Sequence, residues 1–139
     1  MLIKKILPLF GILMMVAGPA AAQGTKTIKE KKIVTLTVHE YFVEEGLDDP
    51  VVESIERYNE EGEILEVKEM NRRGEVRKWE KYKYDEEGNL VEEVFLDSKG
   101  RITRTEKNIY SDGLRIEKQY FNSREMMFKR KVYEYEYRE

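Results

Sequence analysis

The sequence predicts an all-β protein, an antiparallel meander of about seven to eight strands in a single curled sheet built from repeated β-hairpins. The first observation is a recurring turn signature: an aromatic or apolar residue, Asn or Asp, two polar residues, Gly, one more residue, then Ile, Leu or Val. The second is the spacing of the turn glycines, which leaves strands of about eight to ten residues. The third is the abundance of Val, Ile, Thr, Tyr and Phe between turns, as is typical of strands.

The turn signature has four full copies and two shorter ones. They are Tyr58 to Ile64, Met70 to Val76, Tyr84 to Leu90, Leu96 to Ile102, Tyr110 to Leu114 and Phe121 to Met126. Asn or Asp bonds its own backbone and Gly accepts positive φ, so each full copy predicts a type I turn with a bulge. Asp112-Gly113 predicts a two-residue type I′ turn, and the last copy places Glu125 at the glycine position.

The N-terminus is typical of a secretory signal peptide over residues 1–22. Lys4 and Lys5 form its basic start, Ile6 to Val16 its apolar region, and the small residues up to Ala22 its cleavage site. A retained membrane helix is the alternative, but the apolar run is short for a membrane span. We therefore expect cleavage after Ala22, a periplasmic or secreted product, and no stable membrane anchor. The absence of Cys excludes an acyl anchor on cysteine and any disulfide.

The net charge argues against a polyanionic partner. Cleavage after Ala22 removes two lysines and no acidic residue, so a net charge of −3 becomes about −5. Nucleic acid and anionic membranes reward a basic surface. The chain is therefore expected to bind neither, and its regularly spaced aromatic residues favour a folded sheet over disorder.

The elements follow in order along the chain. Residues 23–31 are expected to be a flexible N-terminus and residues 32–139 the β-meander repeat domain. Ile33 to Val43 alternates as a strand, and a turn follows near Gly46 and Pro50. Residues 51–58 have a spacing that a helix also allows, with strand preferred. The outer strands, Ile33–Val43 and Met127–Tyr137, are the exposed edges, the latter guarded by Lys129, Arg130 and Lys131.

Register follows if each turn Asn or Asp pairs with the residue four later. One apolar row is then expected across four strands, namely Ile55, Val67, Trp79 and Phe95, with Trp79 in the core. Opposite charges are expected at Glu69 with Arg77 and at Lys81 with Glu93. The other face groups Tyr58 with Ile64, Met70 with Val76, Tyr84 with Leu90, and Leu96 with Ile102.

The chemical inventory predicts no catalytic residue, no metal site and no cofactor. His39 is the only His and is expected to be a surface strand residue, and no Cys is present. A zinc site, a Ser-His-Asp set and a Cys-His pair therefore cannot be assembled in the usual way.

Carboxylates leave one enzymatic alternative, a hydrolase or carbohydrate-acting enzyme that uses two of them. The acidic clusters are Asp48-Asp49, Glu60-Glu61 and Glu86-Glu87. All three fall in turns, where solvated polar residues are expected in any case. The Asp-x-x-Gly turns lack the further ligands of an EF-hand calcium loop.

The aromatic residues are the remaining candidates for binding. Tyr offers a flat apolar body with a polar tip, suited to stacking on a sugar or a peptide. The candidates are Tyr82, Tyr84, Tyr133, Tyr135 and Tyr137. The competing interpretation is that they pack against neighbouring strands.

The unit Tyr84-Asp85-Glu86-Glu87-Gly88-Asn89-Leu90 resembles the YD repeat of RHS-type proteins, and the resemblance covers about residues 54–137. It implies long sheets that act as scaffold or surface modules without catalysis. The repeats here are spaced 24 to 26 residues apart, whereas the family spacing is nearer twenty. The leader followed by one small hairpin domain is also similar to small exported proteins of unknown function from gut-type Gram-negative bacteria.

The function expected from these observations is that of an exported, non-enzymatic β-sheet module that binds a protein or a cell-envelope component. The sheet would bind through a face or an open edge. The alternatives are the envelope hydrolase and a homo-oligomer formed edge to edge.

Overall fold

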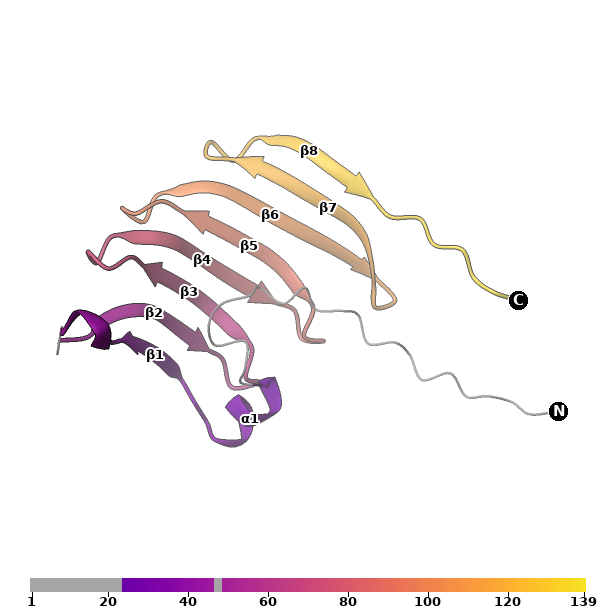
Figure 1. The fold of residues 1–139 in the computed structure, drawn as a ribbon. Helices are drawn as coiled ribbons and strands as arrows, with labels where there is room; N and C mark the ends of the chain where they lie inside the picture. Colours follow the sequence, from indigo (N-terminus) through magenta and orange to yellow (C-terminus); the bar gives the residue numbers. More distant parts are fainter. Residues whose placement is uncertain (1–23, 47–48) are drawn as a thin grey trace.

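The computed structural model describes residues 24–46 and 49–139 and has one eight-stranded sheet. All neighbouring strands are antiparallel and follow chain order from β1 to β8 (Figure 1). The strands are β1 (Thr35–Glu40), β2 (Val51–Tyr58), β3 (Ile64–Met70), β4 (Val76–Tyr84), β5 (Leu90–Leu96), β6 (Ile102–Ser111), β7 (Leu114–Asn122) and β8 (Met127–Val132). The antiparallel meander is confirmed, as is the strand at residues 51–58.

The sheet is open, with β1 and β8 at its two edges (Figure 1). It is neither closed nor strongly curled, so the curled sheet expected from the sequence reduces to a gentle bend. The first expected strand is shorter than predicted, because the 3₁₀ helix η1 (Val43–Glu45) follows and ends at Gly46 with φ +65°. The last strand ends at Val132 rather than Tyr137, because β7 begins at Leu114 and leaves little strand to pair with.

The turn signature forms the turns that it predicts. In the β2–β3 turn the Asn59 side chain accepts hydrogen bonds from the Glu61 and Glu63 amides, at 3.0 and 2.9 Å. Gly62 follows with φ +80°. The two less regular turns also fit, because Asp112 and Gly113 both have positive φ and Glu125 takes φ +61° at the position of the missing glycine.

Six hairpins contain a β-bulge at the same place, just after the turn. The residue that each bulge leaves without a direct partner across the hairpin is Leu65, Arg77, Val91, Thr103, Ile116 or Phe128. The pairs next to the turn are those expected, including Tyr58 with Ile64 and Met70 with Val76. Beyond each bulge the pairing is displaced by one residue from the expected register. Two residues that were expected to lie opposite each other therefore lie on different faces of the sheet.

The expected apolar row is therefore wrong. Trp79 lies opposite Lys68 instead of Val67, and Phe95 lies opposite Glu80. Ile55 and Trp79 share one face, while Val67 and Phe95 share the other. The expected charge pairs are wrong for the same reason, since Glu69 pairs with Lys78, and Lys81 pairs with Val94.

The two faces of the sheet differ in burial. We call the face that carries Glu56, Tyr58, Val67, Glu80, Tyr82, Glu93, Glu106 and Tyr120 the tyrosine face, and the face that carries Ile55, Trp79, Lys81, Val94 and Phe121 the tryptophan face. Most of the buried residues lie on the tyrosine face, and they include carboxylates as well as apolar side chains. Polar burial of this kind needs partners for each charged group.

Helix α1 (Thr25–Glu30) lies within the segment expected to be a flexible N-terminus. Its Ile28 is 1% exposed. Its Thr25 carbonyl oxygen is so close to Gly62 that a Cβ on Gly62 would stand only 2.4 Å from it. Lys29 also forms an ion pair with Glu61. The helix thus docks on the β2–β3 turn (Figure 1). Among residues 24–46 and 49–139, no helix has the length and apolar character needed to cross a membrane.

Candidate functional site

The tyrosines singled out from the sequence do not form one surface. Tyr82 is 4% exposed and belongs to the interior of the tyrosine face, whereas Tyr84 is half-buried beside a turn. Tyr133, Tyr135 and Tyr137 lie in the segment after β8, and their exposure rises along the chain. The structure therefore divides the candidates into a packed set and an exposed set.

Tyr82 belongs to a tyrosine–glutamate ladder on the tyrosine face. The Tyr58 hydroxyl donates to Glu56 Oε2 at 2.5 Å, and the Tyr82 hydroxyl donates to Glu80 in the same way, two residues along its own strand. Burial raises the pKa of both phenols, and the hydrogen bond to the carboxylate adds to the rise. Glu106, at the equivalent place on β6, pairs with Lys118 at 2.5 Å and Arg104 at 3.2 Å.

Glu93 lies in the middle of this face. It stands directly opposite Tyr82 on one side and Glu106 on the other. Burial, reinforced by the nearby Glu80 and Glu106 carboxylates, raises the pKa of Glu93 to about 7. Lys118 opposes that rise. Glu93 is thus a carboxyl group that titrates near neutrality, but it lies within a packed row of side chains.

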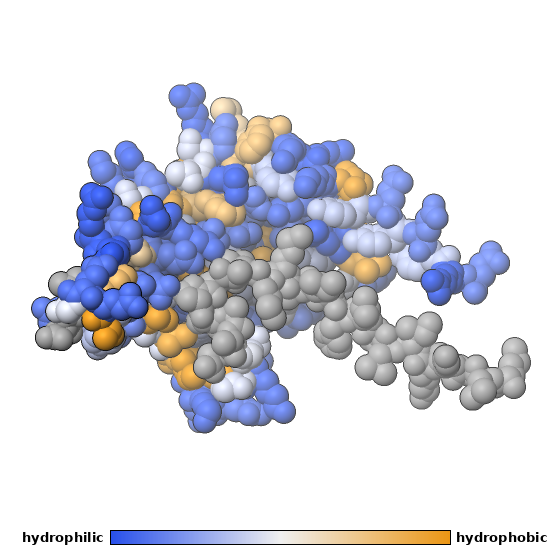
Figure 2. Space-filling view, viewed as in Figure 1, coloured by the Kyte–Doolittle hydropathy of each residue, from blue (hydrophilic) through white to orange (hydrophobic). Residues whose placement is uncertain are grey.

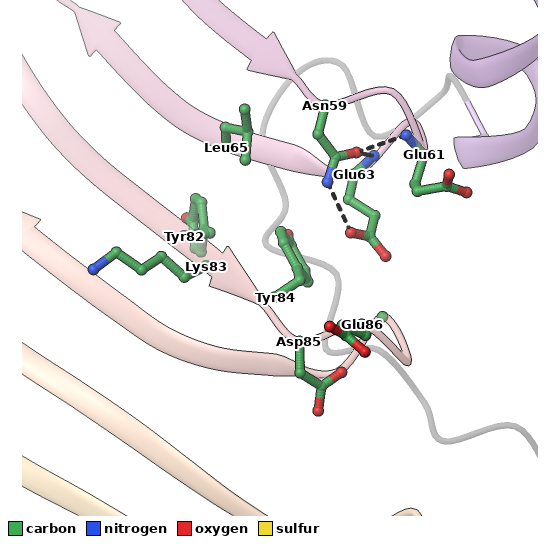
Figure 3. Close-up of a pocket in the computed structure, with 10 residues that line it drawn as sticks. Asn59, Glu61, Glu63, Leu65, Tyr82, Lys83, Tyr84, Asp85 and Glu86 are labelled. Atoms are coloured by element: carbon green, nitrogen blue, oxygen red, sulfur yellow. Dashed lines mark hydrogen bonds between the residues drawn. The ribbon is translucent and has the colours of Figure 1, made fainter.

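A hollow of about 410 Å³ lies between the β2–β3 and β4–β5 turns. Figure 3 shows Tyr84 between Glu63 of the β2–β3 turn and Asp85 and Glu86 of the β4–β5 turn, with Tyr82 further along β4. Asn59 Nδ2 donates to Glu63 Oε2 at 2.9 Å, and Asn89 Nδ2 donates to Asp85 Oδ2 at 3.0 Å. The hydrogen bond from the Asn89 side chain, followed by backbone amides, lowers the pKa of Asp85.

The described residues of the acidic clusters considered for hydrolysis lie at the turns or a bend. Glu61 bonds Lys29, and Glu86 and Glu87 lie exposed in the β4–β5 turn. Asp48 lies outside the described residues, and Asp49 is exposed. No group of three or more His, Cys, Asp or Glu side chains is placed to hold a metal in the described part of the chain. His39 is exposed on β1.

On the tryptophan face, the Trp79 ring is covered by a lysine side chain and is not fully buried. Lys68 Nζ lies 4.1 Å from the centre of the Trp79 ring, and the indole N–H donates to Glu66 Oε1 at 2.6 Å. The Trp79 ring also packs on Gly100, where a Cβ would come within 3.2 Å of it. Trp79 is half-buried, so its expected place in a closed core is wrong. Next to it, a shallow groove of about 920 Å³ has Val94, Leu96 and Phe121 among its lining residues.

The exposed apolar side chains gather around β8 and the segment after it. Half of the large hydrophobic side chains exposed in the described residues lie between positions 126 and 137; these are Met126, Met127, Phe128, Val132, Tyr135 and Tyr137. Every residue of β8 is exposed. Figure 2 shows an apolar group at the β7–β8 end of the sheet against a mostly hydrophilic surface.

The β8 edge also presents unpaired backbone groups. The Tyr133 amide donates to the Ile116 carbonyl at 3.0 Å. Lys131 and Lys129, two and four residues earlier, therefore also direct their amides toward β7, where they pair with Lys118 and Tyr120. In an antiparallel strand the intervening residues point the other way, so the amides of Val132 and Arg130 face away from the sheet. We define the β8 edge as residues 127–137, which comprise β8 and the extended segment after it.

Two features of this site were missed in the sequence. The tyrosine–glutamate ladder has a signal, because Glu56-Arg57-Tyr58, Glu80-Lys81-Tyr82 and Glu106-Lys107-Asn108 recur at the repeat spacing. The displacement of register by the bulges has no comparable signal. In comparison with known proteins, no family model and no curated protein matches the chain.

Proposed function

We propose that this chain is an exported, non-enzymatic binding module, and that its β8 edge takes up a strand of a protein in the cell envelope. The observation that carries the proposal is the coincidence of exposed apolar side chains with outward-facing amides on β8. Strand addition uses both, because main-chain hydrogen bonds supply affinity and alternate side chains supply specificity. Exposed apolar groups at an open sheet edge favour such pairing.

The carboxylates support a binding role over a catalytic one. A glycoside hydrolase needs two carboxyl groups that flank a substrate cleft. Three turn carboxylates are engaged, Glu63 by Asn59, Asp85 by Asn89 and Glu61 by Lys29, and Glu86 and Glu87 are exposed. The buried Glu56, Glu80 and Glu106 are held by tyrosines or cations. Export is supported by the leader pattern of residues 1–22. N-terminal sequencing of the product secreted or retained in the periplasm should begin at Gln23.

The experiment uses proline to block one side of β8. Val132→Pro removes an amide that faces away from β7, so the fold is expected to persist because proline is tolerated on an edge strand in that orientation. Val132→Ala keeps the amide and serves as the matched control. Both exported variants are used to capture proteins from envelope extract.

The alanine variant and the unmodified chain should retain the same envelope protein, and the proline variant should lose it. Equal capture by the alanine and proline variants would place binding elsewhere on the sheet. Capture of a second copy of this chain counts as capture of an envelope protein. If the unmodified chain captured neither a second copy nor any other envelope protein, the binding proposal would be contradicted. Circular dichroism of each variant verifies that the sheet is intact.

A further inference from the structure

The segment after β8 extends beyond the strand that should support it. Tyr133 bonds Ile116, and the Tyr135 hydroxyl donates to the Arg115 carbonyl at 2.5 Å. Because β7 starts at Leu114, residues 136–139 have no stretch of β7 beside them. Figure 1 shows this segment leaving the sheet in an extended form. An extended segment next to an open edge is suited to pairing with another strand.

The charges along the β8 edge change sign about its middle. Lys129, Arg130 and Lys131 precede Val132, and Glu134 and Glu136 follow it. An antiparallel strand that carries the same sequence therefore presents its acidic half to the basic half of the first. Opposite charges across a strand pair are favourable, and like charges directly opposite are not.

A symmetric antiparallel pair allows few registers. Directly opposite residues must share a face, so the two-fold axis has to pass through a residue paired with itself. Axes at Lys129, Arg130 or Lys131 set identical cations against each other, and an axis at Glu134 does the same for carboxylates. An axis at Tyr133 sets Val132 against Glu134.

The axis at Val132 avoids these conflicts. The pairs that it forms are Val132 with Val132, Lys131 with Tyr133, Arg130 with Glu134 and Lys129 with Tyr135. Two of these place a lysine beside a tyrosine ring, a favourable contact that Lys129 already makes with Tyr120, at 4.1 Å. The amides of Val132 and Arg130 point outward, as this register requires.

We infer that the β8 edge binds the β8 edge of a second copy of this chain, in an antiparallel pair centred on Val132. The inference rests on the proposed function, because it names a second copy of the chain as the partner that the strand-binding edge takes up. The two sheets then form one continuous sheet, and each extended segment covers part of the exposed β8 surface of the other copy.

The other edge of the sheet is a poorer match. β1 offers only Glu40 as a carboxylate against the three cations of β8. Pairing of β1 with β8 would also be head to tail and would continue into filaments, because it leaves a free edge at each end. The self-pairing closes at two copies.

The test measures the mass of the exported chain in solution by sedimentation equilibrium across a range of concentrations. The unmodified chain should form a dimer. Arg130→Glu and Glu134→Arg should each weaken dimerisation by about tenfold or more, because each places like charges opposite in two symmetric positions. The double variant, with the charges exchanged, should recover the dimer. Arg124→Glu, which changes the charge equally in the β7–β8 turn, is the control.

A monomer at all concentrations would overturn the inference, as would a dimer that tolerates both single reversals. Growth into filaments would overturn it in favour of β1–β8 pairing. A dimer weakened by each reversal but not recovered by the double variant would overturn the register. If the chain is monomeric but still captures another envelope protein in a Val132-dependent way, the proposed function stands without this inference. If it does neither, both fail.

Discussion

The Tyr82 hydroxyl donates a hydrogen bond to the Glu80 carboxylate, two residues earlier on β4, and both side chains are buried. Tyr58 and Glu56 repeat the arrangement on β2. A one-layer sheet cannot bury large amounts of apolar surface, and these pairs allow polar side chains to occupy its most enclosed positions. The repeat thus supplies a buried polar row as well as the turns.

Removal of the Tyr82 hydroxyl tests this row. Tyr82→Phe should destabilise the domain by about 1–3 kcal/mol, because Glu80 is left buried without its hydroxyl donor. Tyr137→Phe should have a negligible effect, since Tyr137 is 78% exposed. Urea unfolding followed by Trp79 fluorescence measures both. Equal stability of the two variants would show that the Tyr82 hydrogen bond adds nothing.

Glu93 makes the stability depend on pH. Its pKa is raised from 4.5 to about 7 in the folded protein, so the folded state holds a proton that the unfolded state releases. Its contribution to stability is therefore complete below pH 4.5 and is lost as the pH rises toward about 7. Glu93→Gln should flatten this dependence and be more stable than the unmodified chain above neutrality.

The measurement is urea unfolding at several pH values between acid and mildly alkaline solution. Glu92→Gln serves as the control, because Glu92 lies on the tryptophan face and forms an ion pair with Lys83 at 2.8 Å. A pH profile unchanged by Glu93→Gln would contradict the raised pKa.

The docking of α1 is tested at a turn glycine. Gly62 and Gly74 have nearly the same φ, +80° and +79°, but only Gly62 is covered, by the Thr25 carbonyl. Both Gly→Ala substitutions cost energy because of positive φ. Gly62→Ala should cost more, and it alone should increase proteolysis within residues 25–30. Equal melting temperatures with no new cleavage would show that α1 is not held there.

The displaced register is tested with paired cysteines in a chain that has none. Glu69 lies opposite Lys78, so Glu69→Cys with Lys78→Cys should form a disulfide on mild oxidation. Glu69→Cys with Arg77→Cys should not, because Arg77 is the residue left over by the bulge. Mass spectrometry after thiol labelling counts free cysteines. The opposite pattern would restore the register expected from the sequence.

The turns and strands could be predicted because their determinants are local. Asn59 and Gly62 define a turn by their own backbone preferences. In the last turn Asn122 does so through its side chain, which accepts hydrogen bonds from the Arg124 and Met126 amides, although Glu125 stands at positive φ in place of glycine. The strand pairing beyond Met70 could not be predicted. The bulge that leaves Arg77 without a direct partner follows from the geometry of the hairpin and not from its composition. The sequence therefore pairs Trp79 with Val67, whereas in the sheet it lies opposite Lys68.

The candidate site was only partly predictable. Tyr135 and Tyr137 are exposed near an edge, as their position at the end of the repeat suggests. Tyr82 is buried, like Tyr58 and Tyr120, because its strand has a neighbouring strand on each side. Which strand is central depends on the whole topology, so sequence alone does not separate a binding tyrosine from a packing one.

The pairing of the β8 edge is tested most directly by amide hydrogen exchange at Val132 and Arg130. Lys131 and Lys129 face β7 and serve as internal references, since their amides should be protected at every concentration. We expect exchange at Val132 and Arg130 to be fast in dilute solution and to slow markedly as the concentration of the exported chain rises. Fast exchange at these two amides at every concentration would contradict edge pairing between two copies.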